Sequence, residues 1–218
     1  MQAAAITKAL VAASANGVAA SQTPLAAGFL TLTANPVVLD SQRRILVTPG
    51  GDDHLLTITI IGTDDTGNAI KDSFAGGNSV AVASNLDFKT VTSIYVSGAT
   101  ASTVEVGTNG VGASPWKLFA DSIETPNMSL NMQLVSGAGN AGIQYTYDPI
   151  QAPAGVQTAI ANAAVLPLPQ TLAHPTLNNI AASLDGTINW TIHAWRLIIN
   201  SGTGTWKATG RQAGLASP

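Results

Sequence analysis

Short segments in which apolar and polar side chains alternate occur along most of the chain. In Leu55–Gly62, the apolar residues Leu56, Ile58 and Ile60 are separated by threonines. Because successive side chains of a β-strand point to opposite faces, this pattern predicts a strand with one buried face. Met128–Val135 repeats the alternation with Ser129, Asn131 and Gln133 as the polar positions, and predicts a second strand of the same kind.

Further strands follow from short runs of Val, Ile, Thr and aromatic residues bounded by Gly, Asn, Asp and Pro. These runs are 28–33, 43–48, 68–74, 79–84, 90–97 and 103–107 in the first half, and 143–147, 187–200 and 204–209 in the second.

Three polar, glycine-containing segments are predicted to join neighbouring strands into hairpins. They are TDDTG at 63–67, SGAGNAG at 136–142 and SGTG at 201–204. Residues 149–175 contain several prolines and no clear helical stripe, so a long excursion with at most one short helix is expected there. The end of the chain, 211–218, is expected to be a loose tail.

This spacing of strands, without alternating helices, predicts an all-β fold of two β-sandwich domains, jelly-roll or Ig-like. A glycine cluster at 107–112, followed by Ser114-Pro115-Trp116, marks the expected domain boundary. We therefore predict a first domain at 25–113 and a second at 114–218, preceded by an extended N-terminal arm or edge strand at 1–24.

Composition narrows the range of functions. Charged residues make up 10% of the 218 residues, far below the ~25% typical of soluble domains, and nine Lys and Arg are scattered among twelve Asp and Glu. This balance gives no footprint for a phosphate backbone, so direct nucleic-acid binding is not expected. The chain has no cysteine, which excludes disulfides and thiolate chemistry. The alanine-rich start is a weak match to a secretion signal, and no apolar run reaches the ~18 residues of a membrane span.

The sequence contains one triplet that also occurs in a class of catalytic sites. Asp65-Thr66-Gly67 spells the triplet of aspartic proteases, in which two carboxylates share one proton. The triplet occurs once, in a predicted turn, and Gly62-Thr63-Asp64 replaces the apolar lead-in that such a site needs. We interpret it as a turn, with an aspartyl hydrolase as the weakest alternative.

Candidate metal ligands are few. The acidic pairs Asp52-Asp53 and Asp64-Asp65 could offer oxygen ligands to calcium only if they converged, but they flank opposite ends of one predicted strand. The histidines His54, His174 and His193 lack the spacing of a zinc site. No metal and no cofactor are therefore expected.

Two kinds of side chain are candidates for contacts with partners. Arg43 and Arg44 are adjacent in a predicted strand, so one of them must point toward the core or a partner, where it could form an intersubunit or interdomain ion pair. Trp116, Trp190, Trp195 and Trp206 all lie in the second half. A core role is favoured for the tryptophans, and Trp116, beside the domain boundary, joins the two arginines as a candidate interface residue.

The order of these motifs resembles a widespread type of virion protein of tailed bacteriophages. In the first half, the resemblance is carried by PVVLDSQRRILVTPGG, LTITIIGTDDTGNAI, FKTVTSIYVSG and VEVGTNGVGASPW. In the second half, AWRLIINSGTGTWKATGRQAG is similar to the last hairpin of those proteins. The resemblance covers most of the chain, and its motifs are structural and only moderately specific.

What the resemblance implies is a non-enzymatic structural component, located in the virion and present in many copies. Its expected partners are itself, as a homo-oligomer, and the major capsid protein or the neck or tail proteins, with no membrane involved. Capsid decoration or a head-to-tail role is favoured because the chain is short and lacks the repeats of a fibre. The alternative is a tail-tip receptor- or glycan-binding module, which would use exposed tryptophans along a groove.

Overall fold

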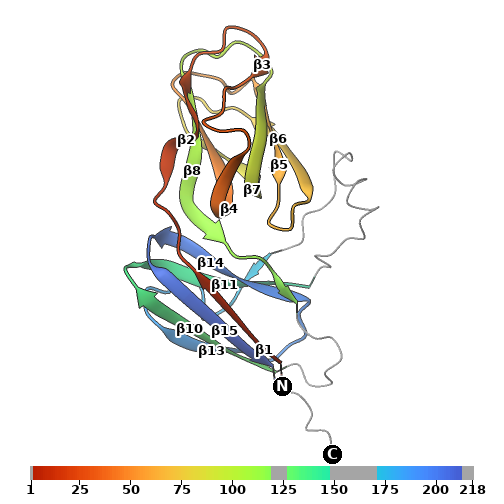
Figure 1. Cartoon of the computed structure of the whole chain (residues 1–218), viewed down its shortest axis with the longest axis vertical. Coiled ribbons are helices and arrows are strands. Elements are labelled where there is room, and N and C mark those ends of the chain that lie inside the picture. Colours follow the sequence, from red (N-terminus) through yellow and green to blue (C-terminus); the bar gives the residue numbers. More distant parts are fainter. Residues whose placement is uncertain (1, 119–126, 148–170, 213–218) are drawn as a thin grey trace, which may run out of the picture. The chain divides into compact units, whose positions relative to one another are not determined.

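The computed structural model describes residues 2–118, 127–147 and 171–212. All regular structure in these residues is β, and most of the strands pair antiparallel, which confirms the all-β prediction (Figure 1). No helix suited to crossing a membrane occurs in this part of the chain. Most of the predicted excursion at 149–175, and the tail beyond 212, lie outside the described residues.

The strands are β1 (Gln2–Lys8), β2 (Ser14–Gln22), β3 (Gly28–Phe29), β4 (Val37–Pro49), β5 (Thr57–Thr63), β6 (Ala69–Ala75), β7 (Val82–Val96), β8 (Val104–Ala113), β9 (Lys117–Leu118), β10 (Met128–Ser136), β11 (Gly139–Thr146), β12 (Leu172–Ala173), β13 (Leu184–Ile188), β14 (Ala194–Gly202) and β15 (Thr205–Gln212).

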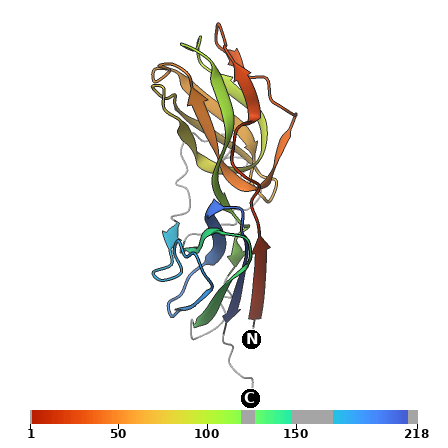
Figure 2. The ribbon, with the colours of Figure 1, turned by 90° about the vertical axis from the view of Figure 1, so that its left-hand side faces the viewer.

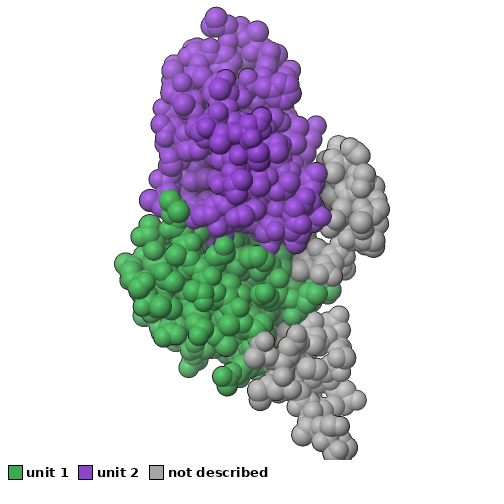
Figure 3. Space-filling model, in the orientation of Figure 1, with its two compact units in different colours: residues 1–11, 113–156, 163–218 green, residues 12–112, 157–162 purple. Residues whose placement is uncertain are grey.

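These strands divide between two compact units (Figure 3). Unit 2 contains residues 12–112, and unit 1 contains residues 1–11 together with the described residues from 113 onward. The N-terminal segment 1–24 is thus shared, because β1 belongs to unit 1 and β2 to unit 2. Strand β8 runs from unit 2 up to Ala113, the first residue of the second part of unit 1.

In unit 2 the strand order is β8-β4-β7-β5-β6, with β2 added to β8 and β3 added to β7. Ile58 and Ile60 are buried in the core while the alternating residues Thr57 and Thr59 are not, as the sequence pattern predicted. The hairpin predicted at TDDTG is also present, since β5 and β6 pair along their whole length.

The predicted strands at 79–84 and 90–97 are parts of one long strand, β7. Its pairing with β4 shifts register between Arg44 and Leu46, so that β7 carries an irregularity around Ser84–Leu86. In the sequence, the polar residues of this stretch indicate a loop between two separate strands. In the structure they mark a bend within one continuous strand.

In unit 1, one sheet has the order β1-β15-β10-β13. The other sheet has the order β12-β11-β14 with β9 paired to β14, and β8 is the next strand after β14 in that order. Side chains from both sheets meet in one core, where Leu130, Met132 and Trp206 of the first sheet pack with Ile143 and Leu197 of the second.

Two of the three predicted hairpins are wrong. The SGAGNAG segment joins β10 to β11, and the SGTG segment joins β14 to β15, but each connection crosses from one sheet to the other. The two crossings lie against each other, with Gly204 N donating to Ala138 O at 3.0 Å. The positive φ of Gly139 (153°) and Gly202 (78°) lets the backbones approach closely there. Because each crossing places consecutive strands in opposite sheets, the apolar faces of these strands point toward each other and form one shared core.

The N-terminal strands are held by the cores of the two units. Ile6 and Leu10 belong to the core of unit 1, and Val18 and Ala19 are fully buried in unit 2. The sequence gives this alanine-rich segment too few apolar residues for a core of its own, so it is buried by packing on the cores of the two units, where small side chains fit between larger ones.

Candidate functional site

Arg43 is 1% exposed and lies inside unit 2. Its Nε and Nη2 donate to the two carboxylate oxygens of Asp40, each at 2.7 Å, in a bidentate ion pair. Nη1 lies 3.4 Å from Thr108 Oγ1 and 3.3 Å from the carbonyl oxygen of Asn109, both on β8. The candidate interface arginine therefore already has partners within its own unit, and it links β4 to β8.

Arg44 points to the other face, as adjacent strand residues should, and its side chain is 41% exposed. Its Nε donates to Asp87 Oδ1 at 2.9 Å and its Nη1 to the carbonyl oxygen of Ser84 at 3.1 Å. These contacts hold β4 beside the irregular part of β7.

A buried carboxylate completes the bend in β7. Asp72 of β6 accepts hydrogen bonds from the amides of Asn85 and Leu86, and Ser84 Oγ accepts one from Ile45 N at 2.9 Å. These bonds satisfy backbone groups that the irregular ladder leaves without a strand partner. Asp72, Ser84 and the amides that they bind therefore stabilise the bend, and we call this cluster the clamp on β7.

Trp116 is half-buried in unit 1. The guanidinium of Arg196 lies over its ring, 4.6 Å from the centroid, and Arg196 Nε donates to Gln144 Oε1 at 2.9 Å. The ring thus has one face covered by a cation from β14.

The TDDTG segment is a turn organised by Asp64. Its Oδ1 accepts from the amides of Thr66 and Asn68, both at 2.9 Å, and its Oδ2 accepts from Asn68 Nδ2 at 2.9 Å. Gly67 supplies the positive φ, 86°. Asp65 accepts a hydrogen bond from the buried Gln42 side chain.

The second acidic pair, Asp52 and Asp53, lies in a loop of unit 2, and Asp53 connects this loop to two others by hydrogen bonds. Asp53 is buried and its Oδ1 accepts from Ala101 N at 2.7 Å, while its own amide donates to Gly77 O at 2.9 Å. Asp52 is exposed and lies 2.6 Å from His54 Nδ1, and this hydrogen bond lowers the pKa of the Asp52 carboxyl. No three His, Asp or Glu side chains of the described residues gather as metal ligands would.

His174 is a buried residue of unit 1 with three backbone partners. Its Nδ1 accepts from Leu177 N at 3.0 Å and Thr176 N at 3.2 Å, which assigns the proton to Nε2, 3.1 Å from Thr187 O. Burial lowers the pKa of the imidazole. His174 therefore acts as a neutral brace between the 174–177 turn and β13.

The remaining tryptophans are mainly core residues, as predicted. Trp195 and Trp206 are 2% and 0% exposed. Trp190 is half-buried, stacks on His174 at 6.4 Å and meets Tyr145 edge-to-face at 5.8 Å. The indole nitrogens of Trp190 and Trp206 are buried without a hydrogen-bond partner in the described residues.

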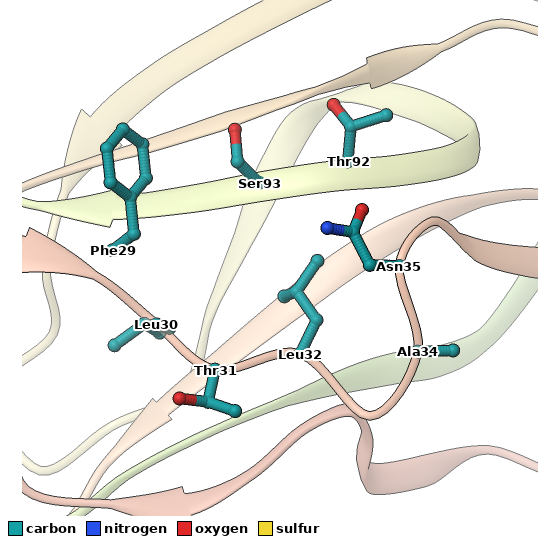
Figure 4. A pocket seen from close by; sticks show the side chains of 8 residues that line it. All are labelled: Phe29, Leu30, Thr31, Leu32, Ala34, Asn35, Thr92 and Ser93. Atoms are coloured by element: carbon teal, nitrogen blue, oxygen red, sulfur yellow. The ribbon is translucent and has the colours of Figure 1, made fainter.

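A shallow groove of about 510 Å³ lies on unit 2 beside an exposed aromatic ring (Figure 4). Phe29, 69% exposed, meets Tyr95 edge-to-face at 5.4 Å. The loop with Leu32 and Asn35 lies next to the β7 residues that complete the groove, Thr92 and Ser93. Neutral hydroxyl and amide groups thus line the groove together with an aromatic ring, and the lining contains no tryptophan.

Sequence reasoning missed this groove and the clamp on β7. Phe29 was placed in a strand, and nothing in one sequence indicates which strand residues stay uncovered. The partner of Arg43 was also missed, because residues three apart in a regular strand point to opposite faces. The register shift between Val38 and Arg43 brings Asp40 round to the same side.

Comparison of the chain with protein-family models, with curated proteins and with solved structures gave no match.

Proposed function

We propose that the chain is a non-enzymatic structural component of a tailed-bacteriophage virion, built into the particle in many copies. Its partners would be further copies of itself and the major capsid protein or neck or tail proteins, with capsid decoration or a head-to-tail role favoured. In this proposal both units are β-sandwiches.

The observation that carries the proposal is the way two of the phage-like motifs fit together. LTITIIGTDDTGNAI contains β5, the turn after it and the first two residues of β6, and FKTVTSIYVSG contains the second part of β7. These strands are neighbours in one sheet, with Gly62 of β5 opposite Ile70 on one side and Ile60 opposite Ile94 on the other. A resemblance scattered over unrelated elements would carry less weight than one that forms a single structural unit.

The surface supports assembly. Few charges oppose contact between copies, and unit 2 exposes large apolar side chains, among them Leu25 (87%), Leu55 (85%) and Val80. Leu25, Leu55 and Val80 flank loops that are joined by hydrogen bonds, such as Thr100 N to Pro24 O and Ser79 N to Gly51 O. A preorganised surface loses little conformational entropy on binding.

The proposal is tested by quantitative mass spectrometry of purified particles of the virus that encodes the chain. The chain should be present in a fixed ratio to the major capsid protein, corresponding to many copies per particle. Its absence from purified particles, with expression in the infected cell, would contradict the proposal.

A second candidate is a tail-tip receptor- or glycan-binding module, and the groove beside Phe29 favours it. An exposed ring among neutral hydroxyl and amide groups suits the apolar face and the hydroxyls of a sugar. Glycan-array binding that is lost in Phe29→Ala and kept in Val38→Ala, an exposed residue outside the groove lining, would support this candidate. Absence of binding to any glycan would remove it.

A further inference from the structure

The sheets of the described residues end at β1 and β13 in one sheet and at β6 and β12 in the other, and β2, β3 and β9 pair on one side only. These strands differ in how well they are protected against pairing with another chain. An unprotected edge offers backbone donors and acceptors to any strand that can align with it.

The strands other than β1 carry features that hinder such pairing. Strands β3, β9 and β12 are only two residues long, and β2 contains Gly17 and pairs with two register shifts. Strand β6 has Asp72 at its centre, whose charge points inward to the amides of β7, and next to it a lysine, Lys71. Strand β13 is only five residues long and contains Asp185 and Gly186. Charges, inward-pointing charges and short length are the usual protective features of edge strands.

Strand β1 has none of these features between Ala3 and Thr7. It pairs with β15 over seven consecutive residues without a register shift, so it is long and regular. It contains no proline or glycine, and its single charge, Lys8, is at one end. Figure 2 shows β1 (red) as the outermost strand of its sheet, beside β15.

We propose that β1 pairs antiparallel with β1 of a second copy of this chain, so that two four-stranded sheets become one. The inference depends on the geometry of β1 and not on the proposed function. A chain that stayed monomeric would overturn this pairing and leave the particle proposal standing.

The faces of β1 restrict the register. Ile6 is buried in the core, whereas Ala5 and Thr7 are exposed. Paired residues of two strands share a face, so an even position must lie opposite an even position. Of the registers that meet this condition, only the one centred on Ala5 aligns all seven residues. It places Ala5 opposite Ala5 of the second copy, and Lys8 opposite Gln2 instead of a second lysine.

The test is the oligomeric state of the full chain by sedimentation velocity over a range of concentrations. Wild type should form dimers, of twice 22.1 kDa. Ala5→Lys should be monomeric, because two like charges would lie directly opposite each other, and Ala5→Glu should be monomeric for the same reason. An equimolar mixture of the two variants should restore dimers, since opposite charges then meet.

Thr7→Glu is the matched control. It adds a charge to the same exposed face, but in the Ala5-centred register it does not lie opposite itself, and within the chain it lies opposite Lys207. It should remain dimeric. A monomeric wild type, or dimers that persist in both Ala5 variants, would overturn the proposal.

Hydrogen exchange keeps the test decisive if the Ala5 variants fold poorly. In the wild type, amides within Ala3–Thr7 that do not bond to β15 should become protected as protein concentration rises. Exchange of those amides that is independent of concentration would overturn the proposal as well.

Discussion

Asp40 and Arg43 form a bidentate ion pair within one strand, at 2.7 Å for both hydrogen bonds, with Arg43 buried. Removing one member of a buried pair leaves the other charge without compensation, which is costly. Asp40→Ala should therefore lower the free energy of unfolding by about 3 kcal/mol. Urea denaturation of the purified chain measures this loss.

Arg44 provides the matched control for this experiment. Its pair with Asp87 is partly solvated, so Asp87→Ala should cost less than about 1 kcal/mol. Equal losses for Asp40→Ala and Asp87→Ala would show that burial does not determine the strength of these pairs.

Substitutions of the two aspartates in the β5–β6 turn should differ sharply in their effect on the free energy of unfolding. Asp64→Ala removes the acceptor of four hydrogen bonds, from Thr66 N, Thr66 Oγ1, Asn68 N and Asn68 Nδ2, and should cost about 2 kcal/mol. Asp65→Asn keeps an oxygen acceptor for Gln42 and should change stability by less than about 0.5 kcal/mol. Under the proposed virion function, particle assembly should also be unaffected.

Thermal unfolding of the two variants, together with assembly of particles that carry Asp65→Asn, provides the comparison. Loss of assembly or of a proteolytic activity in a normally folded Asp65→Asn chain would revive the aspartyl-hydrolase alternative.

The stability of the chain should depend on pH through His174. Because its folded-state pKa is lowered below the ordinary value of 6.5, the unfolded chain binds the proton more readily. Stability should be full above pH 6.5 and fall as pH drops below it, until the lowered pKa is passed. Urea midpoints measured from pH 8 to pH 5 should show this slope.

The slope should disappear in His174→Gln, which cannot be protonated. It should persist in His54→Gln, since His54 is exposed. An unchanged slope in His174→Gln would assign the pH dependence to other groups.

Two glycines of β8 offer a test of how tightly β2 is packed. A Cβ at Gly107 would lie 1.8 Å from the carbonyl oxygen of Ser14, whereas a Cβ at Gly110 would meet open space. Gly107→Ala should lower the free energy of unfolding by about 2 to 3 kcal/mol, because backbone must move to relieve the clash. Gly110→Ala should have little effect. Similar losses in both would show that β2 does not pack against β8 at Gly107.

Much of the fold could be predicted from the sequence, because alternation reports burial directly. Ile58 and Ile60 lie on the buried face as expected, and the Asp, Thr and Gly preferences at 63–67 located the β5–β6 turn. Strand pairing was harder to predict. A tight glycine turn after Met128–Ser136 suits a hairpin and a crossing between sheets equally well, and only the packing of the shared core decides between them.

The candidate site was less predictable than the fold. Adjacent Arg43 and Arg44 do point to opposite faces, but their partners depend on register shifts in β4 and β7 that no local pattern announces. The exposure of Phe29 and the position of β1 at the edge of its sheet, as seen among the described residues, depend on the whole arrangement of strands and not on a local pattern.

The most direct test of the central claim is a cryo-EM map of the purified particle. If the chain is a virion structural protein, the map should contain density that fits both units, repeated with the symmetry of the capsid, neck or tail and in contact with neighbouring subunits. A fully interpreted map in which no density accommodates either unit would contradict the account.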